Sequence, residues 1–536
     1  FFFKQKTAYE IPKRDWSSDV CSSDLRGMHG WPTIHFDLGR VADWLHGVLP
    51  AGFYYKTFKW PVRAWPWYES LIRRAAGLGR APQHAGGPQI ERRHAQADVL
   101  VVGAGPAGCA AVGRLVAAGC SVIWVDDRGR PGGALGASGE PGDAQSLQAL
   151  RRDAESWESA PGLRRLADTV LLGLHDHGQA IALQRDGWAR ECLWMLRVKA
   201  VCLATGAFER GLPFENNDLP GVMMAGAVRS ALHRHAVAPG RQLMVAGSGA
   251  SAWQAAISAY DCGMAVTAVV TSAQSPVPGS LADAVAQRGI AIASGQLVRA
   301  HGHHTGLGSV SVRTARGMQT YGCDVLAISG GWTPALQLHV QAGGVARYDP
   351  ALGTLRGECR PDTPVLAGAA AGCVATDECV ASGEQAAQAV LSRLAAMRAG
   401  QRVSVPVQGA PAPVGAGALP ASAEVAADEP APGRVFVDLA GDVTAADITL
   451  AWREGYTATE LLKRYTTLGM GPDQGRSAGI EGLLQMARLQ GRDPATLPPT
   501  RARPPFVPVA FGTLADRKST RLNSSHVSES RMPSSA

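Results

Sequence analysis

The sequence predicts an α/β fold in which parallel strands alternate with helices. An apolar strand that runs into a glycine-rich turn and then into a helix of small residues occurs twice, within 97–127 and again from 242 onward. Two further apolar strands, within 201–214 and 324–334, also end at glycines. Strands that are apolar throughout suit a parallel sheet with both faces covered. At roughly 150 residues per domain, the chain is long enough for two to four domains.

The first copy, ADVLVVGAGPAGCAAVGRLVAAGCSVIWVDD, has glycines at 103, 105 and 108 in the GxGxxG spacing. Gly103 permits a tight turn, Gly105 lets the backbone approach a pyrophosphate, and Gly108 lets helix and strand pack closely. The amino end of the helix can then receive phosphates. The next strand ends at Asp126, whose carboxylate can bind ribose hydroxyls. The pattern predicts a bound adenine dinucleotide, with further contacts from Pro106, Ala107, Asp127, Arg128, Gly132 and Gly133.

The second copy, LMVAGSGASAWQAAISA, places Gly247 and Gly249 in the same turn and replaces the third glycine with Ala252. The strand that follows, 265–270, ends at Thr271-Ser272 and offers neither an acid nor a base to a ribose. Two interpretations stay open for this turn. It either binds a second nucleotide or keeps its shape for packing alone.

Composition excludes several classes of protein. Residues 1–25 and 516–536 lack apolar periodicity and resemble translated sequencing adaptor, so we expect them to be non-native. Without them the formal charge falls from +7 to about +5, and no basic run with interleaved aromatic residues predicts nucleic-acid binding. The ten cysteines include no CxxC pair, which indicates reduced, mostly buried thiols in a cytoplasmic protein. Glycines interrupt the apolar stretch 98–125, so we expect no membrane span.

The two turns, together with VCLATGAFERGLPF (201–214) and DVLAISGGWTP (324–334), resemble the pyridine nucleotide–disulfide oxidoreductase superfamily across about 97–398. The resemblance implies two Rossmann-like FAD/NAD(P)-binding domains, with contacts from Thr205 and Gly206. In these flavoproteins a late strand ends in a Gly-Asp pair whose carboxylate holds the flavin. Here PVLAGAAAG (364–372) has Gly368 followed by Ala369. We therefore expect NAD at the first site, with FAD as the alternative.

Segments outside this core resemble the alpha subunits of heterotetrameric sarcosine oxidases, over nearly all of 30–515. They are FDLGRVADWLHGVLPAGFYYKTFKWP (36–61), YESLIRRAAGLGRAP (68–82) and DVTAADITLAWREGYTATELLKRYTTLGMGPDQGR (442–476). The resemblance implies a beta subunit that carries FAD and the amine site, small gamma and delta subunits, and FMN at the alpha–beta interface. It also implies a ferredoxin-like part before this region and a folate-binding part after it. We expect an internal fragment, which would reach tetrahydrofolate only through the missing C-terminal domain.

A small helical domain is expected after a Pro/Ala/Gly-rich linker. Capping boxes are predicted where a threonine precedes a carboxylate by three residues, at Thr444-Ala-Ala-Asp447 and Thr457-Ala-Thr-Glu460. In cluster-binding relatives the resemblance places four [2Fe–2S] cysteines in this BFD-like domain. The matching positions here are Asp438, Ala440, Asp473 and Ala478, and none can supply the cysteine sulfur that such clusters require. We expect this domain to hold no cluster.

These observations predict the following order along the chain. Residues 1–25 are adaptor-like, 26–96 form a helical connector, 97–240 with 320–398 form the first dinucleotide-binding domain, 241–319 form the second, 399–433 are the linker, 434–502 are the small domain, 503–515 lead toward the folate-binding part, and 516–536 are adaptor-like.

The expected function is that of the nucleotide-binding alpha subunit of a sarcosine oxidase, a flavoprotein of amine catabolism whose isolated fragment is inactive. The alternatives are a proline, opine or other amino-acid dehydrogenase subunit, and a non-catalytic scaffold with structural NAD. No catalytic group is evident. His233, His235 and the cluster His301, His303 and His304 have no acid or cysteine at ligand spacing, so no metal is expected. Glu209 and Arg210 either touch a cofactor or form an exposed pair, and the exposed pair is favoured.

Overall fold

The computed structural model describes residues 61–75, 89–186, 190–247, 249–272, 279–303, 306–400 and 434–514. The chain divides into two compact units, the first comprising 1–92, 185–193 and 507–536 and the second 93–184 and 194–506. The expected adaptor-like ends, most of the connector, and all but two residues of the linker lie outside the described residues. No described helix is both long and apolar enough to cross a membrane.

The described residues of the first unit are mostly helical or extended, and they include the ends of strands β1 (Gln89–Val102), β5 (Gln179–Asp186) and β6 (Arg190–Leu203). The unit also contains the 3₁₀ turn η4 (Val62–Ala64), helix α4 (Trp65–Ala75) and the short helix α15 (Phe511–Leu514). The side chain of Thr513 donates to Glu191 at 2.5 Å, and Arg185 donates to the carbonyl of Pro508 at 3.0 Å. Residues 507–514 are therefore fastened to the segment 185–193 of the same unit.

The first of two large sheets contains the strands of the first glycine-rich turn. Its strands are β1 (Gln89–Val102), β2 (Val122–Val125), β3 (Leu163–Leu166), β4 (Thr169–His175), β5 (Gln179–Asp186), β6 (Arg190–Leu203) and β18 (Val365–Leu366). They lie in the order β3-β2-β1-β6-β5-β4, and β18 pairs with β6. The β1–β2, β2–β3 and β6–β18 pairs are parallel, as the apolar strands predict, whereas β4 and β5 form an antiparallel hairpin around η6 (Asp176–Gly178).

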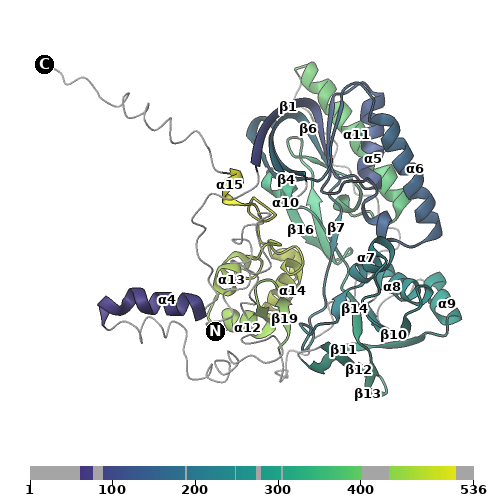
Figure 1. The fold of residues 1–536 in the computed structure, drawn as a ribbon, viewed down its shortest axis with the longest axis vertical. Coiled ribbons are helices and arrows are strands. Elements are labelled where there is room, and N and C mark those ends of the chain that lie inside the picture. Colours follow the sequence, from purple (N-terminus) through teal and green to yellow (C-terminus); the bar gives the residue numbers. More distant parts are fainter. Residues whose placement is uncertain are drawn as a thin grey trace. The chain divides into compact units, whose positions relative to one another are not determined.

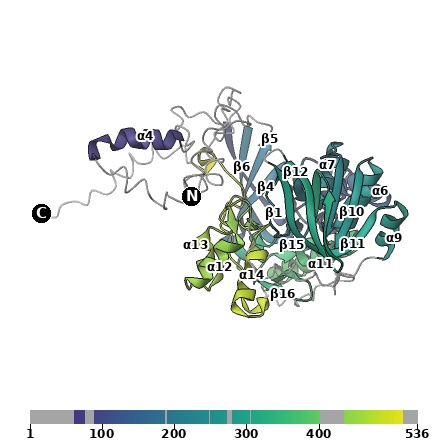
Figure 2. The same ribbon diagram turned by 90° about the horizontal axis from the view of Figure 1, so that it is seen from below.

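The second large sheet contains the second turn and lies beside helices α7, α8 and α9 in Figure 1. Its strands are β8 (Val222–Met224), β9 (Gln242–Gly247), β10 (Ala265–Thr271), β11 (Ala291–His303), β12 (Gly306–Thr314), β13 (Gly317–Gly322) and β14 (Val325–Ser329), in the order β13-β12-β11-β10-β9-β14-β8. Figure 2 shows β10, β11 and β12 side by side. Two of its strands, β8 and β14, lie outside the range 241–319 expected for the second domain.

Helices cover both sheets and complete their cores. They are α5 (Pro106–Ala117), α6 (Pro141–Trp157) and α11 (Thr376–Arg398) at the first sheet, and α7 (Ala225–His235), α8 (Ala250–Asp261) and α9 (Gly279–Gln287) at the second (Figure 1). Two fully buried tryptophans, Trp124 of β2 and Trp253 of α8, anchor the two cores. Helix α8 is apolar on most of its surface. Its Trp253 and the alanines around it are accordingly completely buried.

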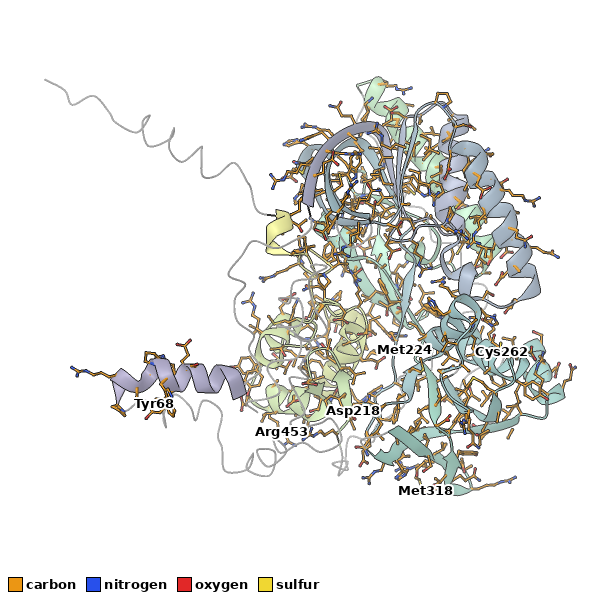
Figure 3. All side chains as sticks on the ribbon, viewed as in Figure 1. Tyr68, Asp218, Met224, Cys262, Met318 and Arg453 are labelled. Carbon is orange, nitrogen blue, oxygen red and sulfur yellow. The ribbon has the colours of Figure 1, made fainter. Side chains whose placement is uncertain are left out.

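Smaller elements lie along the chain between the strands and helices of the two sheets. They are η5 (Gly133–Ala137), β7 (Ala207–Glu209) paired with β15 (Trp332–Pro334), α10 (Gln337–Gln341), the hairpin of β16 (Val345–Asp349) and β17 (Thr354–Glu358), and η7 (Gly368–Ala371). Met224, labelled in Figure 3, ends β8 and is the N-cap residue of α7. Helix α7 thus begins directly at the edge of the second sheet.

The small domain folds around a core of its own within the second unit. It contains β19 (Phe436–Asp438), β20 (Val443–Thr444), α12 (Ala445–Arg453), α13 (Thr459–Thr466), α14 (Gly479–Gln490) and η8 (Pro494–Thr496). Its buried core includes Ile448, Leu462, Leu483 and Met486. The sequence pattern therefore predicted the helical character of this domain correctly.

The two predicted capping boxes differ in outcome. At α12 the box is present: Thr444 N donates to Asp447 Oδ2 at 2.9 Å, and Asp447 N donates to Thr444 Oγ1 at 3.3 Å. The prediction at Thr457 is wrong, because α13 begins later and its N-cap is Ala458. The Glu460 side chain turns away from the helix start and accepts a hydrogen bond from Arg501 N at 2.7 Å.

Several contacts fasten the small domain to the dinucleotide-binding core, among them a hydrogen bond from Asn216 N to Arg434 O at 2.8 Å. Asn217 donates to Phe436 O at 2.8 Å and accepts from Phe436 N at 3.0 Å. Arg476 lies 5.0 Å from the centre of the Phe208 ring. Arg210 reaches Glu481 of α14, with Nη1 and Oε1 3.6 Å apart and both side chains buried.

We predict that Thr444→Ala destabilises α12 locally, because it removes the cap that satisfies donors of the first helical turn. The expected loss in the opening free energy of the helix is about 1 kcal/mol. Hydrogen exchange of the α12 amides measures it directly, since local opening reports local stability. Thr457→Ala is the matched control and should change protection by no more than a few tenths of a kcal/mol. Equal effects of the two substitutions would contradict the assignment of the cap.

Candidate functional site

The first glycine-rich turn is shaped by contacts between backbone atoms. Gly103 has a φ of +110°, and a Cβ added to it would lie 2.1 Å from the carbonyl oxygen of Ala204. A Cβ on Gly108 would lie 2.0 Å from the carbonyl oxygen of Gly103. Both positions therefore exclude any side chain, for the reasons that the sequence pattern predicts.

Gly105 has a different role from its two neighbours. It is the N-cap residue of α5, with ordinary extended dihedral angles of −75° and −177°, and no side chain caps the helix. A Cβ added here would meet only the Cα of Gly133, at 4.0 Å. Because Pro106 has no N–H, the backbone N–H groups of Ala107 and Gly108 are the donors of the first turn, and they have no intrahelical partner. An open helix end of this kind suits a pyrophosphate.

Asp126 follows β2 and lies beside the turn. Its Oδ2 accepts from Ala104 N at 2.5 Å and its Oδ1 accepts from Arg128 N at 2.9 Å. Burial raises the pKa of this carboxyl group, and the two backbone hydrogen bonds oppose that shift. Each carboxylate oxygen can accept a second hydrogen bond, so Asp126 can hold the loop and still bind a ribose hydroxyl. The neighbouring Asp127 is exposed.

The loop after Asp126 folds over the turn. Gly132 N donates to Ala104 O at 2.8 Å, and a Cβ on Gly133 would lie 2.9 Å from the Cα of Gly105. Gly132 and Gly133 have φ values of +135° and +53°. Arg128 Nη1 donates to Gly133 O at 2.8 Å. The predicted loop residues and the predicted turn are therefore brought together.

The remaining residues predicted for the first site approach it from other strands. Thr205 follows Ala204, whose carbonyl lies against Gly103, and its hydroxyl donates to Ala335 O at 2.9 Å. Gly206 accepts a hydrogen bond from Ala335 N at 3.0 Å and has open space around its Cα. Gly368 lies against α5, because a Cβ there would be 2.6 Å from the Cβ of Ala107. Only Gly247 and Gly249 belong to a different site, at the end of β9.

The second turn contains a carboxylate of the protein itself. Glu209 Oε1 accepts from Ser251 Oγ at 2.8 Å and from Ser329 Oγ at 2.7 Å, and its Oε2 accepts from Gly226 N at 2.6 Å. Ser251 lies in the first turn of α8 and Gly226 in the first turn of α7. The Glu209 carboxylate therefore lies at the amino ends of two helices, where the macrodipoles favour an anion.

The structure corrects the expectation of an exposed Glu209–Arg210 pair. Both groups are withdrawn from water, and burial raises the pKa of Glu209 and lowers that of Arg210. They face different partners, since Glu209 binds the serines of the second turn and Arg210 pairs with Glu481. Successive residues of a strand point to opposite sides, which explains why neighbours at the end of β7 diverge. Sequence spacing gave no sign of these partners, because they are 42 to 271 residues away.

The loop 469–476 of the small domain is held by carboxylates at two positions where cluster-binding relatives are expected to have cysteines. The buried Asp438 accepts from Gly469 N at 2.7 Å, Ala440 N at 2.9 Å and Gly441 N at 3.0 Å. Asp473 accepts from Gly475 N at 3.2 Å and from the hydroxyl of Ser477 at 2.6 Å. Both carboxylates thus bind the loop itself. The four positions do not fit an iron–sulfur cluster, and the sequence has no cysteine after Cys379.

The remaining histidines, cysteines and carboxylates that the structure describes form neither a metal site nor a reactive-thiol site. In the part of the chain that the structure describes, no group of three or more His, Cys, Asp and Glu side chains is placed to hold a metal ion. None of the nine described cysteines forms a disulfide, and burial raises the pKa of Cys109, Cys202 and Cys379 to about 12. Thiols with a raised pKa are poor nucleophiles at neutral pH. Cys262, labelled in Figure 3, is exposed at the end of α8.

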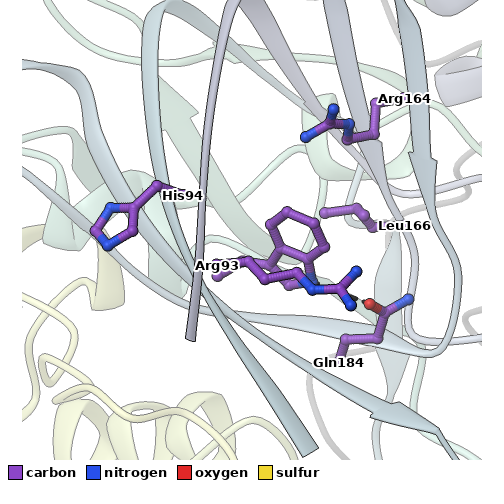
Figure 4. A pocket seen from close by; sticks show the side chains of 6 residues that line it. Arg93, His94, Arg164, Leu166 and Gln184 are labelled. Atoms are coloured by element: carbon purple, nitrogen blue, oxygen red, sulfur yellow. Dashed lines mark hydrogen bonds between the residues drawn. The ribbon is translucent and has the colours of Figure 1, made fainter. Parts of the chain in front are cut away.

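A pocket of about 560 Å³ lies elsewhere on the first sheet and contains none of the predicted site residues. It is lined by Arg93, His94, Arg164, Leu166, Gln184 and Trp194. The guanidinium carbons of Arg93 and Arg164 are 5.6 Å and 5.8 Å from the centre of the Trp194 ring, whose N–H donates to Gln184 at 2.9 Å. Figure 4 shows Arg93, Arg164 and Gln184 gathered around the indole, with His94 pointing away from them.

Comparison with known proteins agrees with this geometry. Residues 97–351 match the pyridine nucleotide-disulphide oxidoreductase family, and residues 432–517 match the sarcosine oxidase A3 domain. The crystal structure of L-proline dehydrogenase from P. horikoshii aligns with a TM-score of 0.60 at 21% identity and covers 82% of each chain. At that identity the likeness concerns the fold alone. The predicted α/β dinucleotide-binding fold is confirmed, and the chain is similar to pyridine nucleotide-disulphide oxidoreductases over residues 97–351.

Two sarcosine oxidase alpha subunits are similar to this chain over most of its length. The chain is 34% identical over 517 residues to the sarcosine oxidase subunit alpha of Rhizobium meliloti (strain 1021), which covers 92% of this chain and 50% of the relative. It is 33% identical over 464 residues to the same subunit of Corynebacterium sp. (strain P-1), covering 82% of this chain and 47% of the relative. The chain is thus a homologue of sarcosine oxidase alpha subunits and spans about half their length.

We predict that Glu209→Ala destabilises the protein by about 1–3 kcal/mol, because the partly buried N–H of Gly226 and the hydroxyls of the buried Ser251 and Ser329 lose their acceptor. Glu209→Gln should be tolerated much better, since its carbonyl can accept from Gly226 while its amide donates to the serines. Urea unfolding measures both variants. Millimolar phosphate should restore part of the lost stability only in the alanine variant. Unchanged stability of Glu209→Ala would show that this carboxylate does not hold the second turn together.

Proposed function

We propose that this chain is the nucleotide-binding alpha-type subunit of a multi-subunit amine oxidoreductase, whose reaction is the oxidative demethylation of sarcosine to glycine. The observation that carries the proposal is the pairing of two features in one compact unit. The first is an open helix end behind a glycine turn that admits no side chain, and the second is the small domain packed on the same core. The match to sarcosine oxidase alpha subunits over most of this chain supports it.

In this proposal the first site binds NAD. The N–H groups of Ala107 and Gly108 bind the pyrophosphate, Gly105 leaves room for it, and Asp126 binds the ribose. Ala369 supports NAD over FAD, because it offers no carboxylate to a flavin side chain at the position after Gly368. A dinucleotide bound here would supply either hydride chemistry or a permanent structural element. The residues of this chain would bind and orient it.

The second glycine-rich turn binds no nucleotide in our proposal. Glu209 supplies the anion that two helix ends favour, with three hydrogen bonds of 2.6 Å to 2.8 Å. A phosphate would have to displace this carboxylate or lie beside it, and like charges at such short range repel strongly. The second turn therefore supports packing, which is the second of the two interpretations that the sequence leaves open.

The assembly follows the expectation from the sequence. We propose a beta subunit that carries FAD and the amine site, FMN at its interface with this chain, and small gamma and delta subunits, all in the cytoplasm. The small domain then serves subunit contact or packing without a cluster, because Asp438 and Asp473 are already engaged by the loop. Tetrahydrofolate would be reached through a separate folate-binding domain.

A non-catalytic scaffold with structural NAD is the second candidate. It is favoured by one observation: burial raises the pKa of Cys109, in the helix that follows the first turn, to about 12, so this thiol is a poor nucleophile at neutral pH. Asp126, whose pKa burial raises, is engaged by backbone N–H groups. A proline or opine dehydrogenase subunit differs from the first proposal only in the substrate of the partner chain.

We predict that Gly105→Ala weakens NAD binding by about tenfold or more without changing stability, because the added methyl meets only Gly133 Cα at 4.0 Å but lies where the pyrophosphate must approach. Calorimetric titration and thermal melting separate the two effects. Gly249→Ala is the matched control in the second turn, where a Cβ meets nothing within 4 Å. It should leave NAD binding unchanged, and a loss there equal to that of Gly105→Ala would contradict the assignment of the first site.

Co-expression of the full-length protein with a beta-type partner tests the reaction. We expect sarcosine-dependent formation of hydrogen peroxide by the complex and none by this chain alone, because the amine site belongs to the partner. Released cofactors can be identified by mass. Activity with proline and none with sarcosine would favour the dehydrogenase alternative, whereas bound NAD without activity toward any amine would favour the scaffold.

A further inference from the structure

The pocket of about 560 Å³ on the first sheet contains none of the residues assigned to the nucleotide (Figure 4). Its six lining residues all belong to the second compact unit, and they lie on the four strands β1, β3, β5 and β6. A pocket of this volume is large enough for a small organic ligand. Because every lining residue lies on a strand, such a ligand would meet side chains here rather than the open end of a helix.

The floor of this pocket is held in one arrangement by the protein itself. Trp194 and Leu166 are buried, and both belong to the apolar interior of the first sheet. The indole N–H of Trp194 donates to Gln184 Oε1 at 2.9 Å, and Gln184 Nε2 donates to the carbonyl of Ala167 at 3.1 Å. Both ends of the Gln184 amide are therefore engaged, and they fix the orientation of the indole ring. A site that is already arranged loses less conformational entropy when a ligand binds.

Two arginines bring positive charge to this floor. The guanidinium carbons of Arg93 and Arg164 lie 5.6 Å and 5.8 Å from the centre of the Trp194 ring. They approach the same ring from different strands, β1 and β3, and the residues that line the pocket include no carboxylate. A guanidinium group that stacks on an aromatic ring still directs its N–H groups outward in its own plane, where they can bind an anion.

Arg164 differs from the arginine that follows it in the chain. Successive residues of β3 point to opposite sides of the sheet. Arg165 donates to Glu158 at 2.5 Å and to the carbonyl of Gly129 at 2.6 Å, so the protein satisfies its guanidinium group. Among the residues that the structure describes, Arg164 contacts the indole ring but forms no hydrogen bond and no ion pair, and its side chain is exposed. Its N–H groups are therefore available on the side of β3 that faces the pocket.

We propose that this pocket binds a small organic dicarboxylate, with one carboxylate on Arg93, the other on Arg164 and the apolar chain beside Trp194 and Leu166. Planar guanidinium groups match planar carboxylates in bidentate pairs. The lining favours carboxylate over phosphate, because phosphate sites commonly use backbone N–H groups at the amino end of a helix. Both guanidinium groups lie beside one ring, so a short chain can reach from one to the other. The pocket is separate from the nucleotide site, and its ligand is independent of the proposed function.

Calorimetric titration of the full chain with succinate, glutarate and adipate tests the proposal, with propionate and inorganic phosphate as comparison anions. We expect the dicarboxylate of best-fitting length to bind about tenfold more tightly than propionate, because it forms a second charge-assisted pair. Phosphate should bind more weakly than that dicarboxylate. Arg164→Gln should lower the affinity about tenfold, and Arg164→Lys should restore only part of it, since lysine keeps the charge but not the planar fork. Added salt should weaken binding, because the two arginines are exposed.

The matched control is Arg197→Gln, which changes an exposed arginine on β6, the strand of Trp194, that does not line the pocket. It should leave the affinity for the dicarboxylate unchanged, and thermal melting should show that all the variants remain folded. NAD titration of Arg164→Gln should match that of the unchanged chain, because the nucleotide site lies elsewhere. The inference is overturned if no dicarboxylate binds, if propionate or phosphate binds as tightly as the best dicarboxylate, or if Arg197→Gln and Arg164→Gln lose equal affinity.

Discussion

The fold depends on one constraint, the approach of backbone to backbone around the first turn. Gly103 meets the carbonyl of Ala204 on β6, Gly108 meets the carbonyl of Gly103, and a Cβ on Gly383 of α11 would lie 2.1 Å from the carbonyl of Ala107 on α5. Strand, turn and two helices therefore touch without intervening side chains. This contact leaves the amino end of α5 uncapped, and every other part of the proposed nucleotide site is arranged around it.

The same strand–turn–helix pattern leads to two different sites. At the first turn the helix end is open, and the loop 128–139 brings arginines to it. At the second turn Glu209 reaches across from β7 and satisfies Ser251, Ser329 and Gly226. A helix dipole favours an anion in either case. The difference is that the protein supplies the anion at the second turn, whereas no side chain caps the helix at the first turn.

The small domain is held to the core by polar contacts that have little access to water. Desolvation raises the pKa of Glu481 and lowers that of Arg210, so their attraction does not repay the loss of hydration in full. Removing either partner would leave the other charge buried and unpaired. The pair is therefore better suited to fixing the position of α14 than to increasing the folding stability of the protein. Within the domain, Asp438 holds the loop through three backbone hydrogen bonds. A loop held in this way keeps its shape without cysteine.

The sequence by itself determined the two strand–turn–helix units, the need for glycine at 103 and 108, and the cap of α12, because each depends on neighbours within a few residues or on a fixed local period. It did not determine the destination of Glu209 and Arg210, the start of α13, or the membership of β8 and β14 in the second sheet. Those features depend on partners up to 271 residues away, and spacing along the chain carries no information about which distant groups meet. The same holds for Arg128, Arg151 and Arg234, which come from a loop and two helices and meet at the carbonyls of Pro131 and Gly133 only because α6 and α7 pack against that loop.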